Sequence, residues 1–127
     1  MASAKNQIEK ITPKITTFIH LMREEKILFT KVYLYGSYAK GKAHKWSDID
    51  VCVISPKFKD LSRATIRLAK LSWKVSSDIE PVAFSPKDFV DENPLVWEIK
   101  QHGIEIQLNG TAGKRVPKKR EKIRRNN

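Results

Sequence analysis

The sequence has a single cysteine, Cys52, so no internal disulfide can form. Its three histidines, His20, His44 and His102, lack the spacing of zinc ligands. No apolar run approaches the roughly 20 residues that a bilayer-spanning helix needs. No apolar stretch follows a basic start at the N-terminus, so we expect no secretory signal. Together these absences favour a cytoplasmic protein over a membrane protein or a disulfide-linked secreted domain.

Length and charge indicate one domain followed by a basic segment. The chain has 127 residues, enough for a single core but too few for two domains. Of the formal net charge of +11, residues 109–127 carry +7 and residues 1–108 only +4. Because residues 109–127 are poor in apolar side chains, we expect a disordered tail there and a folded domain over 1–108. Such a tail is typical either of a solubilising end or of an electrostatic arm for nucleic acid.

Hydrophobic periodicity predicts four strands separated by helices. Apolar residues recur at helical spacing over 8–22, where Pro13 is expected to kink the helix or to occupy its first turn after a Thr12 cap. Strands are predicted at 31–35, 49–54, 78–84 and 104–108, and helices after Gly36, over 60–74, after Ser85 and over 93–102. The order indicates an α/β (α+β) sandwich with one mixed sheet of about four strands flanked by helices. The tryptophans are expected to be core or half-buried packing residues.

Two short motifs, ten residues apart, carry the chemistry that the sequence offers. Gly36-Ser37 follows the first predicted strand, where glycine allows close backbone approach and free amides beside a hydroxyl suit phosphate oxygens. Asp48 and Asp50 begin the second strand, and strand alternation puts both carboxylates on one face. Adjacent carboxylates repel unless a cation lies between them, and Mg²⁺ prefers carboxylate and phosphate oxygens. The pair therefore suits a Mg²⁺–triphosphate complex.

A third carboxylate would complete a two-metal site. The predicted strand at 78–84 offers Asp78 and Glu80, which alternation places on one face. If this strand lies beside 49–54, either carboxylate can reach the metals, as a ligand or as the base for an attacking hydroxyl. The residues alone leave the choice open.

These motifs resemble the nucleotidyltransferase signature of the DNA polymerase beta superfamily. Their form is similar to its minimal, stand-alone bacterial and archaeal branch, which includes the antitoxin nucleotidyltransferases. The matching residues are Leu34-Tyr35-Gly36-Ser37-Tyr38-Ala39-Lys40-Gly41 and Ser47-Asp48-Ile49-Asp50, with looser similarity over 79–82 and 98–105. The resemblance implies a small nucleotidyltransferase fold.

The resemblance also implies the activity and its cofactors. A nucleoside monophosphate, usually AMP from ATP, is transferred from the triphosphate to a hydroxyl acceptor, and pyrophosphate is released. Gly36 and Ser37 would hold the β- and γ-phosphates, and Asp48 and Asp50 would bind two Mg²⁺ ions. For the third catalytic and metal-binding acid we favour Glu80, which lies deeper in the predicted strand than the alternative Asp78.

The expected partners follow from the same resemblance. Members of this branch often pair with a separate helical protein, and in some toxin–antitoxin systems the transferase adenylylates that partner. Because the chain has no second domain to bind an acceptor, we expect a partner protein besides the nucleoside triphosphate, and no membrane. A second interpretation is a nucleotide- or nucleic-acid-binding module with little transferase activity, which would use the basic tail.

Overall fold

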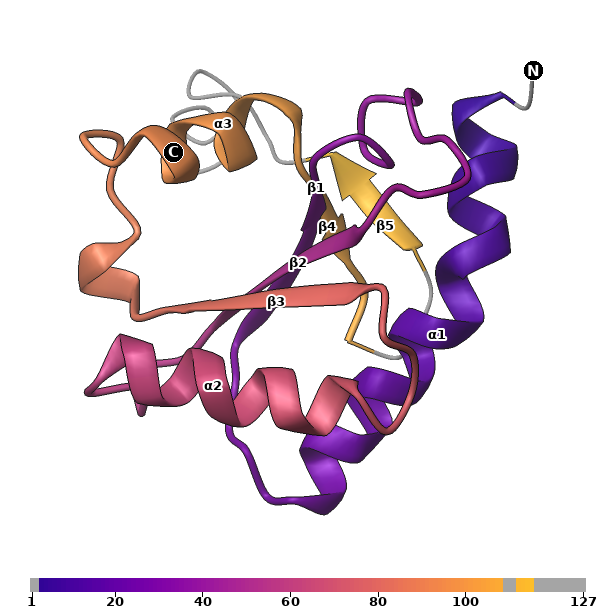
Figure 1. Cartoon of the computed structure of the whole chain (residues 1–127). Coiled ribbons are helices and arrows are strands. Elements are labelled where there is room, and N and C mark those ends of the chain that lie inside the picture. Colours follow the sequence, from indigo (N-terminus) through magenta and orange to yellow (C-terminus); the bar gives the residue numbers. More distant parts are fainter. Residues whose placement is uncertain (1–2, 109–111, 116–127) are drawn as a thin grey trace.

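The computed structural model describes residues 3–108 and 112–115 (Figure 1). They form one mixed five-stranded sheet with the strand order β3-β2-β1-β4-β5. β2 and β3 are parallel, and the other neighbouring strands are antiparallel. The strands are β1 (Lys31–Tyr35), β2 (Ile49–Ile54), β3 (Ile79–Phe84), β4 (Ile104–Ile106) and β5 (Ala112–Arg115). The helices are α1 (Ala4–Glu24), α2 (Leu61–Ser72), the 3-10 turn η1 (Pro86–Asp88) and α3 (Pro94–His102).

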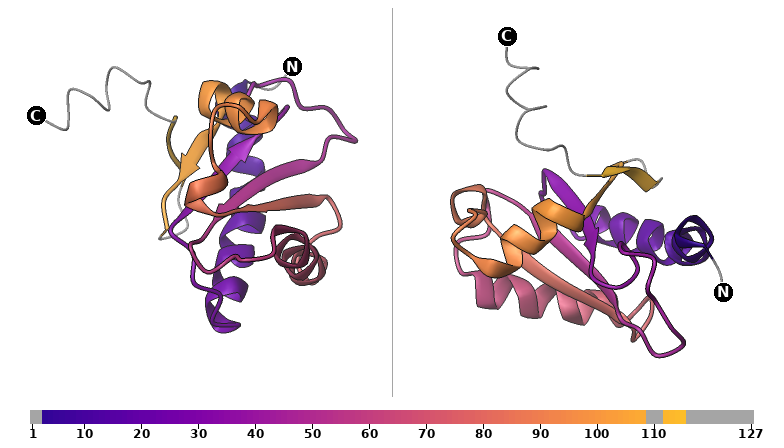
Figure 2. Two further views of the ribbon diagram at one scale, coloured as in Figure 1. Left: turned by 90° about the vertical axis from the view of Figure 1, so that its left-hand side faces the viewer. Right: turned by 90° about the horizontal axis from the view of Figure 1, so that it is seen from above.

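The helices cover the two faces of the sheet unequally. α1 and α2 pack on one face and α3 on the other (Figure 2). Alternate residues of β2 divide between these layers, because Val51 faces the larger core under α1 and α2 while Cys52 belongs to the smaller cluster under α3. The predicted α+β fold with a mixed sheet is confirmed. In the described part of the chain, no helix is long and apolar enough to cross a membrane.

α1 starts earlier than the hydrophobic pattern indicates. Its N-cap is Ser3, whose hydroxyl accepts a hydrogen bond from the Asn6 amide at 3.1 Å. Pro13 lies inside the helix and not in its first turn, so the predicted cap at Thr12 is wrong. The Thr12 hydroxyl instead donates to the Ile8 carbonyl one turn back, at 2.8 Å.

Three further expectations need correction. Residues 37–41 form hydrogen-bonded turns where a short helix was expected after Gly36. β5 pairs with β4 inside the range assigned to the tail, so the sheet has one strand more than expected. The three tryptophans are not core residues, since Trp46, Trp73 and Trp97 are 78%, 65% and 50% exposed. The rest of the predicted disordered tail, 109–111 and 116–127, lies outside the described residues.

Candidate active site

The segment after β1 is a compact turn bounded by two glycines in left-handed conformations. Gly36 has φ +75° and Gly41 has φ +71°, values that residues with a Cβ rarely adopt. Inside the turn, the Lys40 amide donates to the Gly36 carbonyl at 3.2 Å, and the Lys42 amide donates to the Ser37 carbonyl at 2.9 Å. We call residues 36–41 the glycine turn.

The glycine turn and the loop after it are braced by the first turns of α1. A Cβ on Gly41 would lie 2.8 Å from the Cβ of Ala4. The Gln7 side chain donates to the Ala43 carbonyl at 3.0 Å and accepts from the Ala43 amide at 3.3 Å. Further along, the Ser47 hydroxyl accepts from the His44 amide at 2.8 Å. The loop between the two motifs is therefore fixed at several points before it reaches Asp48.

The two motifs meet at Gly36 and Asp50. A Cβ on Gly36 would lie 3.0 Å from Cγ of Asp50 and closer still to one carboxylate oxygen. Only glycine therefore lets the Asp50 carboxylate rest against the backbone at this point. This contact explains why position 36 needs glycine, and it places the Asp50 carboxylate beside the backbone of the glycine turn.

Asp50 lies in a row of polar side chains that crosses three strands. It is paired with Tyr35 on β1 and with Glu80 on β3, so all three belong to the face of the sheet that α3 covers. Asp48 is exposed and precedes β2. The pKa of Asp50 is raised to about 6, first by burial and then by the negative charges of Asp48 and Glu80. The carboxylates of Asp48 and Glu80 thus both lie close enough to Asp50 to disfavour its negative charge.

The donor set suits a metal shared with a substrate. Among residues 3–108 and 112–115, no three Asp, Glu, His or Cys side chains converge closely enough to hold a metal ion by themselves. Mg²⁺ is usually bound by one or two carboxylates together with substrate phosphates and water. Asp48 and Asp50, with Glu80 paired to Asp50 on β3, offer oxygen donors of this kind, and a cation among them would offset the repulsion that raises the pKa of Asp50.

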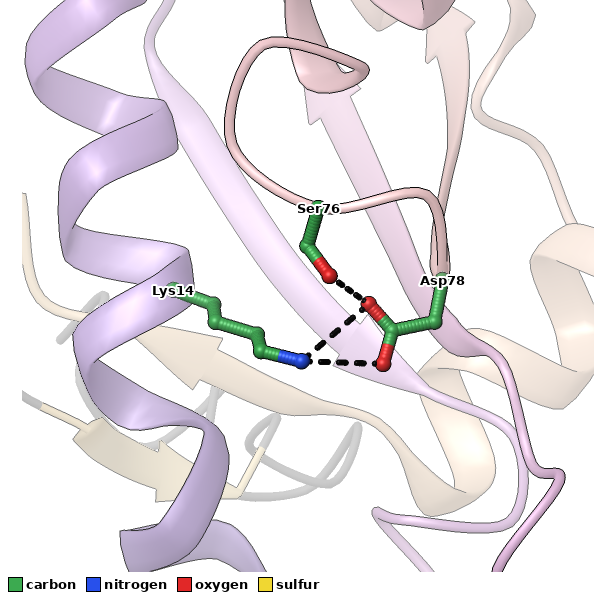
Figure 3. Close-up of polar contacts among 3 residues, drawn as sticks. All are labelled: Lys14, Ser76 and Asp78. Carbon is green, nitrogen blue, oxygen red and sulfur yellow. Dashed lines mark hydrogen bonds and ion pairs between the residues drawn. The ribbon is translucent and has the colours of Figure 1, made fainter.

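Asp78 occupies a different environment (Figure 3). Its carboxylate accepts from Lys14 on α1 at 3.0 and 3.4 Å, and from the Ser76 hydroxyl. Burial opposes the ionised form, but the bonds from Ser76 and Lys14 and the Lys14 charge outweigh it and lower the pKa of Asp78. Because β3 begins only at Ile79 and α1 packs on the other face of the sheet, the expectation that Asp78 and Glu80 share a face is wrong.

Two neighbours of the site, Tyr35 and Glu98, were given no role from the sequence, whereas Lys40 was noted there as one of the lysines that flank the Gly-Ser motif. Burial and the nearby Asp50 charge raise the pKa of Tyr35, which therefore stays a neutral phenol beside the carboxylates. Lys40 in the glycine turn forms an ion pair with Glu98 on α3 at 2.6 Å. Strand alternation in the sequence could have identified Tyr35. It could not show that β1 pairs with β2 or where α3 lies, because both depend on tertiary packing. Cys52 is fully buried in the cluster under α3, and burial raises the pKa of its thiol, as in structural rather than reactive cysteines.

A curated relative is similar to much of the chain. The protein adenylyltransferase MntA of Shewanella oneidensis is 30% identical over 83 residues. The match covers 65% of this chain and 60% of MntA, so the chain spans less than two thirds of that relative.

Solved structures share the fold. A structure from Sulfolobus solfataricus, assigned to a nucleotidyltransferase, has a TM-score of 0.60 at 13% identity over 84% of this chain and 87% of that one, which supports the fold alone. A toxin–antitoxin structure with AMP-PNP has a TM-score of 0.53 at 29% identity, covering 79% of this chain and 73% of the other. A mutant of the toxin–antitoxin MntA-HpeT has a TM-score of 0.52 at 28% identity, covering 72% of this chain and 69% of the other.

The family model of the nucleotidyltransferase domain matches residues 17–106, which contain both motifs and β1 to β4. This match covers well over half of the chain. It agrees with the resemblance carried by Gly36-Ser37 and Asp48-Ile49-Asp50, and with the toxin–antitoxin structures above. The chain belongs to the nucleotidyltransferase domain family.

Proposed function

We propose that this domain transfers AMP from ATP to a hydroxyl group on a partner protein, using two Mg²⁺ ions. The contact between Gly36 and Asp50 is the observation that carries the proposal. It joins a turn suited to phosphate oxygens to a carboxylate suited to Mg²⁺, within a chain of the nucleotidyltransferase family.

Each site residue has a role in this reaction. Gly36 and the Ser37 amide and hydroxyl would hold the β- and γ-phosphates. Asp48, Asp50 and Glu80 would hold the Mg²⁺ ions, which supply charge neutralisation at the triphosphate. The acceptor oxygen forms a bond to the α-phosphorus, the bond to the bridging oxygen breaks, and pyrophosphate leaves. Glu80, exposed at the start of β3, would accept the acceptor's proton.

The partner protein is supported by relatives and by one exposed side chain. MntA is named a protein adenylyltransferase, and two similar structures are toxin–antitoxin structures. Trp46, two residues before Asp48, is 78% exposed. Because aromatic side chains are enriched among the residues that anchor protein interfaces, Trp46 is our candidate contact for the acceptor protein beside the carboxylates.

Labelled ATP tests this proposal. The full chain is incubated with α-³²P-ATP, Mg²⁺ and a candidate partner protein, and label on the partner is measured on denaturing gels. We expect transfer that requires Mg²⁺ and is lost in Asp48→Asn and Glu80→Gln. Asp78→Asn is the matched control and should transfer normally, because Asp78 is paired with Lys14. Normal transfer by Glu80→Gln, or loss of transfer in Asp78→Asn only, would show that the third acid is wrongly assigned.

A further inference from the structure

The ion pair between Lys40 and Glu98 links the glycine turn to α3. Nζ of Lys40 lies 2.6 Å from Oε2 of Glu98, and their side chains are only 35% and 29% exposed. α3 packs through Val96 and Ile99 on the face of the sheet that also carries Asp50. The pair therefore lies on the face of the sheet where the phosphates are expected to bind.

Glu98 lies on a helix that is capped and packed against the sheet. Asn93 caps α3 by accepting from the Leu95 and Val96 amides at 2.9 and 3.4 Å, and Val96 and Ile99 are fully buried. The glycine turn, by contrast, belongs to no helix or strand. Because Glu98 lies on this helix and pairs with the end of the Lys40 side chain, it can restrict the conformations of the glycine turn.

We propose that Glu98 is a positioning residue for nucleotide binding. By holding Lys40, it keeps the amides of the glycine turn aligned for the β- and γ-phosphates. This inference rests on the proposed function, because the aligned groups are those assigned to phosphate binding. Lys40 acts here through the geometry of the turn, and Glu98 acts through Lys40.

The variant Glu98→Gln tests the inference, with Lys100→Gln as its control. Lys100 lies on the same helix and forms an ion pair of similar length, 2.7 Å, with Asp91, but it does not reach the glycine turn. We measure amide hydrogen exchange at residues 40–42, the affinity for AMP-PNP with Mg²⁺, and KM and kcat for ATP. Glu98→Gln should speed exchange and raise Kd and KM about two- to fivefold, the factor expected for a partly exposed ion pair, with kcat unchanged. Lys100→Gln should leave all of these at wild-type values.

The charge-swapped double variant Lys40→Glu/Glu98→Lys separates positioning from direct phosphate binding. It should restore slow exchange and most of the AMP-PNP affinity lost in Glu98→Gln. Unchanged exchange and unchanged affinity in Glu98→Gln would overturn the inference. So would a swap that restores slow exchange but not affinity, since affinity would then follow the charge at position 40 and not the alignment of the turn. If the wild-type chain transfers no AMP to any partner, the proposed function fails, while exchange and AMP-PNP affinity still decide the role of Glu98.

Discussion

Replacing Gly36 by alanine tests the contact that joins the two motifs. The backbone at Gly36 has φ +75°, which costs an alanine about 1–2 kcal/mol. The new methyl group would also overlap the Asp50 carboxylate, and overpacking of this kind costs a further ~1–3 kcal/mol. We therefore expect Gly36→Ala to lower the free energy of unfolding by about 2–5 kcal/mol, measured by urea denaturation with far-UV circular dichroism.

A double-mutant cycle isolates the steric part of that loss. Asp50→Ala removes the carboxylate that the methyl group meets, so Gly36→Ala should cost about 1–3 kcal/mol less in that background. Gly41→Ala is the control, because Gly41 has a similar φ of +71° but faces Ala4. Its cost should be the same with and without the Asp50 side chain. If Gly36→Ala and Asp50→Ala are additive to within about 0.5 kcal/mol, the contact does not govern this site.

Three further outcomes are expected. Because the Asp50 pKa is raised to about 6, the contribution of Asp50 to the stability of the metal-free protein should fall as pH rises from about 4 to about 6, and Asp50→Asn should remove ~1 kcal/mol of that fall after allowance for partial exposure. If Asp50→Asn is as sensitive to pH as the wild type, burial and the neighbouring carboxylates do not raise the pKa of Asp50. The ion pair of Asp78 lowers its pKa, so Lys14→Met should cost about 0.5 kcal/mol at pH 7 and nothing once pH falls below the carboxyl's folded pKa, by thermal unfolding at several pH values. Mg²⁺ with AMP-PNP should raise the Tm of the wild type, and removal of the metal with EDTA or the substitution Glu80→Gln should reduce that shift. An undiminished shift in Glu80→Gln would remove this residue from the site.

The pattern of apolar residues predicted the helices and strands that contribute buried side chains to the core. The range 49–54 matches β2 because its apolar residues fill buried positions on both faces of the sheet. β5 could not be found this way, because Ala112-Gly113-Lys114-Arg115 has no apolar pattern and pairs only at the edge that β4 offers. The exposed tryptophans were misassigned since hydrophobicity alone says nothing of which large side chains stay on the surface.

The site was predicted as far as local spacing allows. Asp48 and Asp50 were assigned to one motif because strand alternation is a local property. The pairing of Asp50 with Glu80 and the bond between Asp78 and Lys14 join segments far apart in the chain, so no spacing rule could distinguish the two acids. That Glu80 serves as the third metal ligand stays a prediction. The contact of Gly36 with Asp50 could not be predicted from the motif either. The motif specifies residue types and spacing, but not which residues come into contact.

The brace between α1 and the loop after the glycine turn limits how this domain can be shortened. The family match begins at residue 17, but Ala4 and Gln7, which contact Gly41 and Ala43, lie before that boundary. A fragment cut at the family boundary would keep every residue of both motifs and lose the supports that fix the loop between them. The minimal unit for biochemistry or for grafting this site is therefore larger than its recognisable sequence, and it includes the first turns of α1.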